Sequence, residues 1–296
     1  MNTQQLQQLL TDHNYPKKAI ASLVSDYEAL CRCPACLLIL QNAEERYKKG
    51  IPFSFYEESE HLIKAAKEST AVHPYGAELL FYLHLAPILQ EQYKKDAIPN
   101  RYFDGMMAGI LCKLFECHRM YGIWGSFVAV WFARFFARSL YAIGRLEFCL
   151  MACPLDFVLA GTTVKKGEML IDVHIPSRGP LKKEELEASY LEAAAFFAEK
   201  TNGKAVFHCE SWLLADFHSE MLPPSSGIRI FADRYHIVEQ TPDEGDFWRI
   251  FYLPDDLPPK DLPEDTALQR GYKKRLLAGL PLYGARGIFV LEAPQK

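Results

Sequence analysis

The sequence lacks the features that mark nucleic-acid-binding, secreted and membrane-spanning proteins. Its 33 Lys and Arg residues are outnumbered by 37 Asp and Glu residues, and a net charge of −4 excludes the dominant basic face of a general nucleic-acid binder. The first residues, MNTQQLQQLL, have neither the basic start nor the apolar centre of a signal peptide. The most apolar span, 127–143, contains Arg134 and Arg138 and is too short for a membrane helix. We therefore expect neither nucleic acid nor membrane as a partner.

Cysteine is present without the pattern of a disulfide framework or a zinc finger. Eight cysteines and no secretion signal indicate free thiols in a reducing cytoplasm. Cys31, Cys33 and Cys36 lie close together, and zinc would need a fourth ligand such as His13 or His61. Because these cysteines lie in helical sequence and no second pair follows, we expect no metal.

The apolar pattern changes at Gly144, and a chain of 296 residues is long enough for two domains. Before Gly144 the apolar residues recur at helical spacing throughout, which predicts a helical N-terminal domain at 1–143. No internal repeat or low-complexity tract is visible. The expected helices begin near Leu6 and then cover 16–30, 33–50, 58–69, 75–95, 102–118 and 128–143.

After Gly144 the chain contains short β-rich runs separated by turn signals, which predicts a second domain at 144–296. A helix is expected at 182–200, and another from Thr266, a plausible N-cap, to Gly279. We interpret 254–265 as an exposed acidic loop before a last strand. The fold class is α+β or α/β, with a mixed sheet flanked by helices. The β-rich runs are 145–153, 156–161, 169–176, 205–214, 228–239 and 247–253.

Short motifs recur in one order over the second half of the chain. They are GRLEF (144–148), VHIP (173–176), GPL (179–181), the helix 189–197, CESWLL (209–214), LPPSSGI (222–228), RYHIV (234–238) and TALQR (266–270). This half resembles the GNAT-like C-terminal domain of N-acyltransferases. The first half resembles their helical N-acyltransferase N-terminal domain, with fewer distinctive residues. The resemblance implies a GNAT-related fold and acyl-CoA as co-substrate, although a fold does not fix a function.

The segment 169–214 combines a strand, a short Arg-Gly loop, an amphipathic helix and a second strand. Ligands of open α/β sheets bind beyond the carboxyl ends of the strands. The resemblance implies that the backbone at Val173 and Ile175 pairs with the pantetheine arm of CoA. It also implies that Ser177, Arg178 and Gly179 bind the pyrophosphate, at a helix N-terminus that favours an anion.

This loop departs from the GNAT pattern. Pro180 has no amide hydrogen to donate, and no second glycine follows Gly179. Glu184 and Glu185 add negative charge to the first helical turn, for which Lys182 and its neighbour could compensate. A tight turn with nothing bound therefore remains an alternative.

His174 lies near the end of its expected strand. Strand alternation places Asp172 and His174 on one face, and Ile171 and Val173 on the other. An imidazole there could serve as general base, removing a proton from an incoming amine. The alternative is a histidine that holds a loop by hydrogen bonds.

Three further candidates follow each other in the second strand. Glu210 could act as a base directly or through water, and Ser211 could orient the acyl carbonyl or the leaving thiolate. Cys209 alternates to the other face from Glu210. With His174 as its base, it would instead act as a nucleophile in covalent acyl transfer or hydrolysis. A buried cysteine in a strand is more often a small packing residue.

Three functional hypotheses follow. The first is an acyl-CoA-dependent N-acyltransferase that transfers an acyl group directly from CoA to a small-molecule or peptide amine, with His174 or Glu210 taking the proton. The second is a non-catalytic ligand-binding or scaffold protein on a degenerate GNAT-like fold, for which Pro180 argues. The third is acyl chemistry at Cys209 without CoA.

Overall fold

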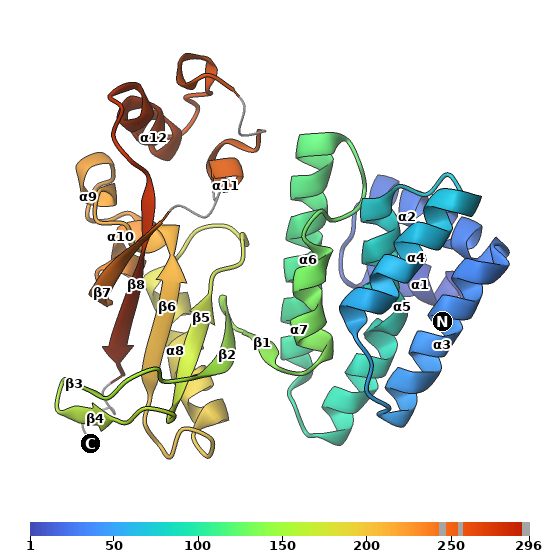
Figure 1. Ribbon diagram of the computed structural model, residues 1–296, viewed down its shortest axis with the longest axis horizontal. Coiled ribbons are helices and arrows are strands. Elements are labelled where there is room, and N and C mark those ends of the chain that lie inside the picture. Colours follow the sequence, from blue (N-terminus) through green and yellow to red (C-terminus); the bar gives the residue numbers. More distant parts are fainter. Residues whose placement is uncertain (243–246, 254–256, 292–296) are drawn as a thin grey trace. The chain divides into compact units, whose positions relative to one another are not determined.

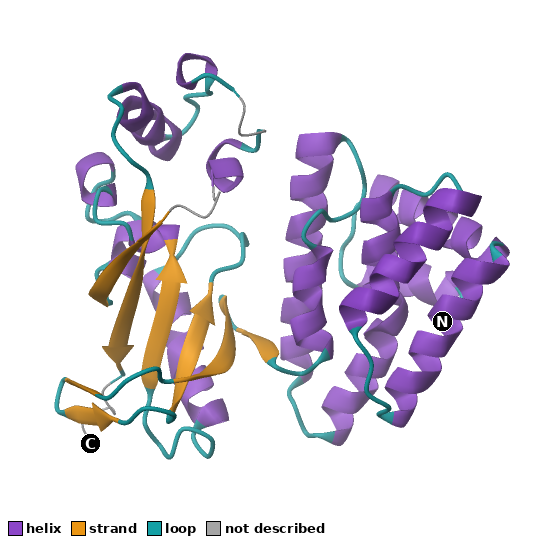
Figure 2. Ribbon diagram, viewed as in Figure 1, coloured by secondary structure: helices purple, strands orange, loops and turns teal. Residues whose placement is uncertain are grey.

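The computed structural model describes residues 1–242, 247–253 and 257–291. The chain forms two compact units, Met1–Tyr141 and Ala142–Lys296 (Figure 1). Helices build the first unit, and a β-sheet with flanking helices builds the second (Figure 2). Among the described helices, none has the length and apolar content that a bilayer span requires.

The helical unit is organised around α5 (Pro74–Lys95). All eight residues from Leu79 to Ala86 are buried, as expected for a helix that is apolar on every side. It packs against most of the other helices of the unit. The other helices of the unit are α1 (Thr3–Asp12), α2 (Lys17–Arg32), α3 (Pro34–Lys49), α4 (Phe55–Ser69), α6 (Asn100–Tyr121), the 3₁₀ helix η1 (Ala129–Phe132) and α7 (Ala133–Phe136).

The second unit contains a six-stranded sheet with the order β1-β2-β5-β6-β8-β7. The pair β5–β6 is parallel, whereas β2–β5, β6–β8 and β7–β8 are antiparallel, so the sheet is mixed. A separate hairpin joins β3 (Phe157–Leu159) to β4 (Thr162–Val164). The strands of the main sheet are β1 (Leu140–Ile143), β2 (Leu146–Ala152), β5 (Met169–His174), β6 (Val206–Ser211), β7 (His236–Pro242) and β8 (Tyr283–Val290).

Helix α8 (Lys183–Phe197) covers one face of this sheet. The ring of Tyr190 contacts Phe148, Phe207 and Phe289, which lie on three different strands, at centroid distances of 6.1, 5.0 and 5.0 Å. This aromatic contact fixes which side chains of each strand point toward the core, because alternate residues face opposite sides. The other helical elements are η2 (Trp212–Leu214), α9 (His218–Met221), α10 (Gly227–Ala232), α11 (Phe247–Phe251), η3 (Pro259–Asp261) and α12 (Ala267–Leu277).

The two helices predicted in this half are confirmed. Leu186, Tyr190, Ala193 and Phe197 of α8 are all buried, as their spacing predicted. Thr266 caps α12 in a capping box: its hydroxyl accepts the amide of Gln269, and the Gln269 side chain accepts the amide of Thr266.

The helix predicted at 128–143 was wrong. Only η1 and α7 form, and the segment from Leu140 to Ile143 is strand β1, buried at every residue. The helix ends because Arg138 adopts a left-handed backbone, with φ of 55°. Its guanidinium binds Asp96 of the helical unit, and the amide of Ser139 donates to the Arg134 carbonyl.

Two runs interpreted as β-rich are partly helical. Residues 228–239 divide into α10 and β7, and 247–251 form α11, whose Ile250 and Phe251 pack into a core cluster with Phe217 and Tyr272. A short apolar run can bury its side chains as strand or as helix, so periodicity alone does not decide between them. The predicted acidic loop 254–265 contains η3 and the buried Leu262, while its residues 254–256 lie outside the described residues.

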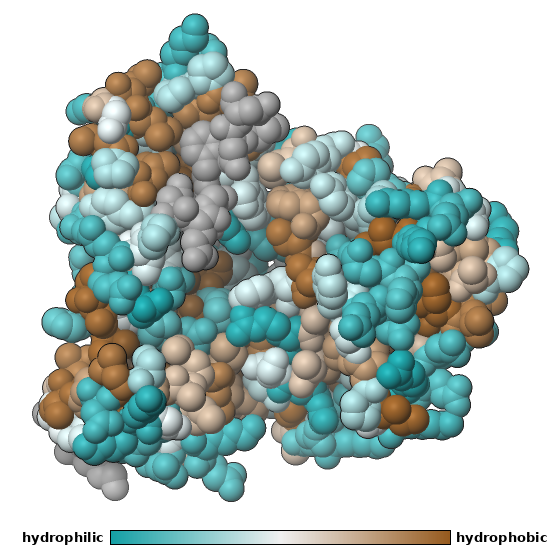
Figure 3. Space-filling view, viewed as in Figure 1, coloured by the Kyte–Doolittle hydropathy of each residue, from teal (hydrophilic) through white to brown (hydrophobic). Residues whose placement is uncertain are grey.

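Hydrophilic and hydrophobic residues are mixed in small groups over the visible face of each unit (Figure 3). Exposed apolar side chains such as Leu38, Val130 and Val158 are ordinary for a protein surface.

Arg145, at the turn between β1 and β2, holds the loop that follows β5. Its guanidinium donates to the carbonyls of Pro176, Gly179 and Pro180, at 2.8, 2.7 and 3.3 Å. Its amide donates to the hydroxyl of Ser189 on α8, at 2.8 Å. One arginine therefore ties this turn to both the loop and the helix that follows it.

We expect Gly144→Ala to destabilise the protein more than Gly179→Ala. Both glycines have positive φ, of 62° and 79°, so alanine costs about 1–2 kcal/mol of backbone strain at either position. At Gly144 the added Cβ would also lie 2.4 Å from Ser189 Oγ, whereas at Gly179 it meets open space. The melting temperature of Gly144→Ala should lie at least about 4 °C below that of Gly179→Ala. Equal melting temperatures would contradict this account of the turn.

Candidate functional site

Polar side chains form a row across the face of the sheet that α8 does not cover. The register places Cys149 of β2 opposite Asp172 of β5, and Asp172 opposite His208 of β6. His174 lies two residues further along β5, on the same face as Asp172. The polar alternation predicted for β5 is confirmed, since Ile171 and Val173 are buried on the other side.

Asp172 is the centre of this row. Its Oδ1 lies 2.8 Å from His208 Nδ1, and its Oδ2 lies 3.1 Å from His174 Nε2. The Cys149 thiol also donates to Oδ2, at 3.6 Å. Burial of the carboxylate opposes its ionisation, but the hydrogen bonds from the two imidazoles lower its pKa well below the usual range. Asp172 is therefore a partly buried anion held by donors from three strands.

Strands β5 and β6 pair over a short stretch only. Their register joins Ile171 to Phe207 and Asp172 to His208. Both strands continue past this point, to His174 and Ser211, but there they pair with their outer neighbours β2 and β8. Within the described residues, β5 and β6 are not paired with each other beyond Asp172 and His208. The two central strands of the sheet therefore separate next to His174.

Glu210 lies on the far side of this parting and is held by an ion pair. Its carboxylate accepts two hydrogen bonds from Arg286 of β8, at 2.8 and 3.1 Å, and Arg286 also binds Glu239 of β7 at 3.0 Å. The hydrogen bond to Glu210 raises the pKa of Arg286. The carboxylate of Glu210 is therefore engaged by Arg286, which argues against its use as an unengaged base.

Cys209 and Ser211 point to the opposite face from His174. Cys209 is completely buried behind the aromatic contact of α8, and burial raises the pKa of its thiol well above the ordinary value. The Ser211 hydroxyl accepts the amide of Leu213 at 3.1 Å and caps η2. The structure therefore separates Cys209 from the base suggested for it, and the cysteine beside His174 is Cys149, with 3.6 Å between Sγ and Nε2.

The loop proposed to bind CoA follows β5 directly. Val173 is buried, Ile175 is half-buried, and Ser177 and Gly179 are exposed. Arg178 folds back, with its guanidinium donating to the Gly144 carbonyl. Arg145 engages the loop through carbonyls rather than amides. At the start of α8 no side chain caps the first amides, which leaves that helix N-terminus open to an anion.

Sequence reasoning missed Cys149, His208, Arg286 and Arg145. Local sequence gives one signal for the first two, the alternation of polar and apolar residues in LEFCLM and VFHCES. Their meeting at Asp172 depends on the strand order, which no local pattern encodes.

The cysteines near the start of the chain have a structural role. Cys33 is the N-cap of α3, and its sulfur accepts the amide of Cys36 at 3.4 Å. The two histidines considered as a fourth ligand are engaged elsewhere: His13 contacts the Leu9 carbonyl, and His61 lies 3.7 Å from Glu58. The structure does not bring either histidine into a ligand set with these cysteines.

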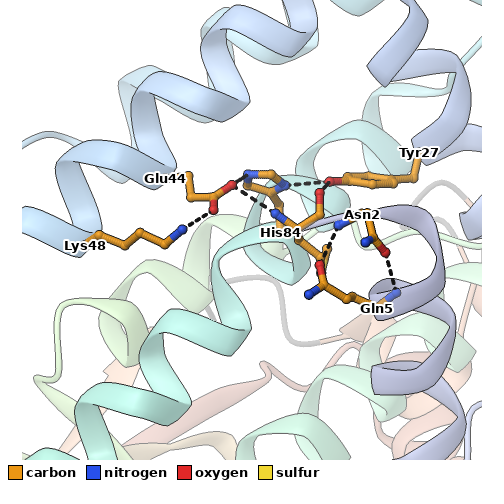
Figure 4. Close-up of polar contacts among 7 residues, drawn as sticks. Asn2, Gln5, Tyr27, Glu44, Lys48 and His84 are labelled. Atoms are coloured by element: carbon orange, nitrogen blue, oxygen red, sulfur yellow. Dashed lines mark hydrogen bonds and ion pairs between the residues drawn. The ribbon is translucent and has the colours of Figure 1, made fainter.

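A second polar network lies inside the helical unit, beside a pocket of about 550 Å³. Figure 4 shows the Glu44 carboxylate between the ammonium of Lys48 and the imidazole of His84. Glu44 Oε2 lies 2.9 Å from His84 Nε2 and 3.0 Å from the nitrogen of Met1, and the Tyr27 hydroxyl lies 2.7 Å from His84 Nδ1. The network joins α2, α3 and α5 at the start of α1.

Burial sets the charges of this network. Burial lowers the pKa of His84 to about 4, despite the neighbouring carboxylate, so the imidazole is neutral near pH 7. Burial opposes ionisation of Glu44, but the hydrogen bond from Lys48 and the other positive groups lower its pKa to about 2. The Tyr27 hydroxyl donates to the Met1 carbonyl at 2.9 Å, so it can accept a hydrogen bond from His84 Nδ1.

The two units match the two parts of one protein family. Residues 140–289 match the GNAT-like C-terminal domain, and residues 4–137 match the N-acyltransferase N-terminal domain. The chain belongs to this N-acyltransferase family. No curated protein gives a significant match.

The fold of this N-acyltransferase family member is similar to solved acyltransferase structures. One, in complex with decanoyl-CoA, has a TM-score of 0.76 at 19% identity, over 99% of this chain and 89% of that chain. Another, in complex with decanoyl-CoA and teicoplanin, has a TM-score of 0.72 at 19% identity, with the same coverage. A third, in complex with CoA and 10C-teicoplanin, has a TM-score of 0.63 at 18% identity, over 99% of this chain and 100% of that chain. At this identity the likeness establishes the fold.

We expect His84→Asn to remove part of the acid sensitivity of the protein. Because the pKa of His84 is lowered from 6.5 to about 4 in the folded state, the unfolded chain binds the extra proton as the pH falls through 6.5. The free energy of unfolding is therefore unaffected by this group above pH 6.5. It decreases as the pH falls from 6.5 toward 4, by at most roughly 3 kcal/mol.

Urea unfolding at pH 7, 6 and 5 measures this effect. The free energy of unfolding of His84→Asn should change less over this range than that of the wild type, although the variant is less stable at pH 7. The control is His61→Asn on the exposed face of α4, which should keep the wild-type slope. A wild-type slope in His84→Asn would show that His84 is not the titrating group.

Proposed function

We propose that this protein is an acyl-CoA-dependent N-acyltransferase that transfers an acyl group directly from CoA to a small-molecule or peptide amine. Membership of the family supports the proposal, as does the similarity in fold to acyltransferases crystallised with decanoyl-CoA. One of those similar structures also contains teicoplanin, which supports an amine acceptor of comparable kind here. All eight cysteines are free, which supports a reducing, cytoplasmic location.

The observation that carries the proposal is the parting of β5 and β6 beside an Asp–His pair. Pairing between these strands stops at Asp172 and His208, and His174 lies immediately beyond it on β5. A thioester placed along the parted strand ends would lie beside an imidazole that is already oriented by a carboxylate. This arrangement supplies both a backbone surface for the co-substrate and a base for the reaction.

The end of β5 and the loop after it are the proposed CoA site. Backbone groups of Val173 and Ile175 would pair with the pantetheine arm, and Ser177, Arg178 and Gly179 would approach the pyrophosphate. The uncapped N-terminus of α8 supports this assignment, since its amides and dipole favour an anion. The hydrogen bonds from Arg145 hold the loop in place without using its amide hydrogens.

His174 is the proposed general base. Its Nε2 lies 3.1 Å from Asp172, so a neutral imidazole that donates Nε2–H to the carboxylate carries its lone pair on Nδ1. The amine nitrogen attacks the thioester carbon, its proton moves to Nδ1, and the C–S bond breaks. The sulfur of CoA leaves as a thiolate and takes up the proton. The Asp172 carboxylate stabilises the imidazolium that forms in between.

A ligand-binding protein without catalysis is the second candidate. Pro180 lacks an amide hydrogen, and Glu184 and Glu185 place negative charge in the first turn of α8, next to the proposed pyrophosphate site. Both features weaken anion binding there.

We expect acyl-CoA to raise the melting temperature of the protein. A ligand that binds only the folded state stabilises it by ~2.7 kcal/mol at one hundred times its dissociation constant. For a protein of this size that corresponds to several degrees. Acetyl-CoA, octanoyl-CoA and decanoyl-CoA are compared by thermal shift with CoA-free buffer. An unchanged melting temperature with every CoA species would contradict the proposed co-substrate.

We expect His174→Gln to lower kcat by about 10²–10⁴-fold, the usual contribution of a general base. The matched comparison is Cys209→Ala, a buried change on the opposite face of the sheet. This variant should retain activity within a few-fold of the wild type. Amide formation from acyl-CoA and an amine library is measured as release of free CoA thiol. If Cys209→Ala is inactive and His174→Gln is active, the direct-transfer mechanism is wrong.

A further inference from the structure

Three side chains in the polar row form a compact set of potential metal ligands. They are the Cys149 sulfur, the Asp172 carboxylate and the His174 imidazole, from strands β2 and β5. Cys149 Sγ lies 3.6 Å from both Asp172 Oδ2 and His174 Nε2, and these two atoms are 3.1 Å apart. Among the described residues, the ligand atoms of these three side chains all lie within 4.8 Å of one another, close enough to hold one metal ion.

The triangle of atoms has the dimensions of a tetrahedral zinc site. Zinc binds sulfur at about 2.3 Å and imidazole nitrogen or carboxylate oxygen at about 2.0–2.1 Å. With tetrahedral angles, the sulfur then lies about 3.5 Å from the nitrogen and the oxygen, which lie about 3.3 Å from each other. The observed separations are within 0.2 Å of these values, so an ion would fit with small side-chain movements.

The surroundings of Asp172 also suit a metal ligand. Its Oδ1 accepts a hydrogen bond from His208 at 2.8 Å, which leaves Oδ2 directed toward Cys149 and His174. A hydrogen bond of this kind to the second oxygen of a ligating carboxylate fixes its orientation. Access is from the side of His174, whose side chain is 24% exposed, while Cys149 is 4% exposed.

We propose that Cys149, Asp172 and His174 bind one Zn²⁺ ion, with the fourth position open to water. On binding, the Cys149 thiol loses its proton to solvent and the thiolate, Oδ2 and Nε2 coordinate the ion. The proton that His174 carried on Nε2 moves to Nδ1, because a neutral imidazole that ligates through Nε2 is protonated on the other nitrogen.

This ion would inhibit the enzyme, a consequence that rests on the proposed function. The proposed reaction requires a lone pair on His174 Nδ1 to take the proton of the amine. Zinc on Nε2 removes that lone pair, because Nδ1 then carries the proton of the neutral imidazole. The same imidazole thus serves either as the base or as a metal ligand, and zinc selects the inactive form.

Cobalt substitution tests the site without any assay of activity. Titration of the metal-free full-length protein with Co²⁺ should give one equivalent of bound ion with a thiolate-to-cobalt absorption band. Zn²⁺ should remove the band by displacing cobalt. Cys149→Ala should lose the band and bind Zn²⁺ at least about 100-fold more weakly, because a direct ligand matters at least as much as the groups that orient one.

Cys209→Ala is the matched control, since it removes an equally buried thiol from the opposite face of the sheet. It should retain the band and the affinity. A band that persists in Cys149→Ala would place the metal elsewhere, and a wild type without a band would refute the site. Zinc affinity should fall by about tenfold for each unit by which the pH is lowered, over the range in which binding releases one proton.

The inhibitory role is tested separately from binding. With each rate expressed relative to the same protein free of metal, Zn²⁺ should lower the transfer rate of the wild type and of Cys209→Ala at least tenfold more than that of Cys149→Ala. Cobalt binding without any acyl transfer would keep the metal site and reject the proposed function. Acyl transfer without the cobalt band would support the proposed function and reject the metal site.

Discussion

The polar face of the sheet depends on one partly buried carboxylate in the middle of the sheet, that of Asp172. Asp172 lies on a strand with neighbours on both sides, so donors from β2, from β5 itself and from β6 can reach it together. A carboxylate in this position without partners would be costly to ionise. The imidazoles of His174 and His208 offset that cost and keep the carboxylate charged. Loss of either neighbouring strand would remove one of these donors, which ties the polar row to the strand order.

The second constraint is the division of the sheet into an apolar and a polar face. Tyr190 of α8 packs on aromatic rings from three strands. This contact determines which residues of each strand point toward α8 and which point to the opposite face. A shift of one residue in any strand would exchange the two faces. For this reason Cys209 is a packing residue, while Cys149, on the other face, becomes part of the polar row.

The sequence allowed good prediction of local features and poor prediction of long-range ones. The helical first half, α8 with its buried face, the Thr266 cap and the polar alternation of β5 all follow from spacing within a single segment. Two partners of Asp172, Cys149 and His208, come from segments more than twenty residues away, and their pairing depends on the strand register, which spacing does not contain. Short apolar runs such as 140–143 and 247–251 were misassigned because strand and helix both bury them.

The two imidazoles on Asp172 are not equivalent, and their difference supports the roles proposed for them. His208 donates from Nδ1 and is nearly buried, and its Nε2 has no hydrogen-bond partner among the described residues. His174 Nε2 lies 3.1 Å from Asp172 Oδ2, and the side chain of His174 is 24% exposed. A base must reach the amine that it deprotonates, which favours the more exposed ring at the parted strand ends. In the proposed mechanism His208 holds the carboxylate in position, and the carboxylate in turn orients the more accessible His174.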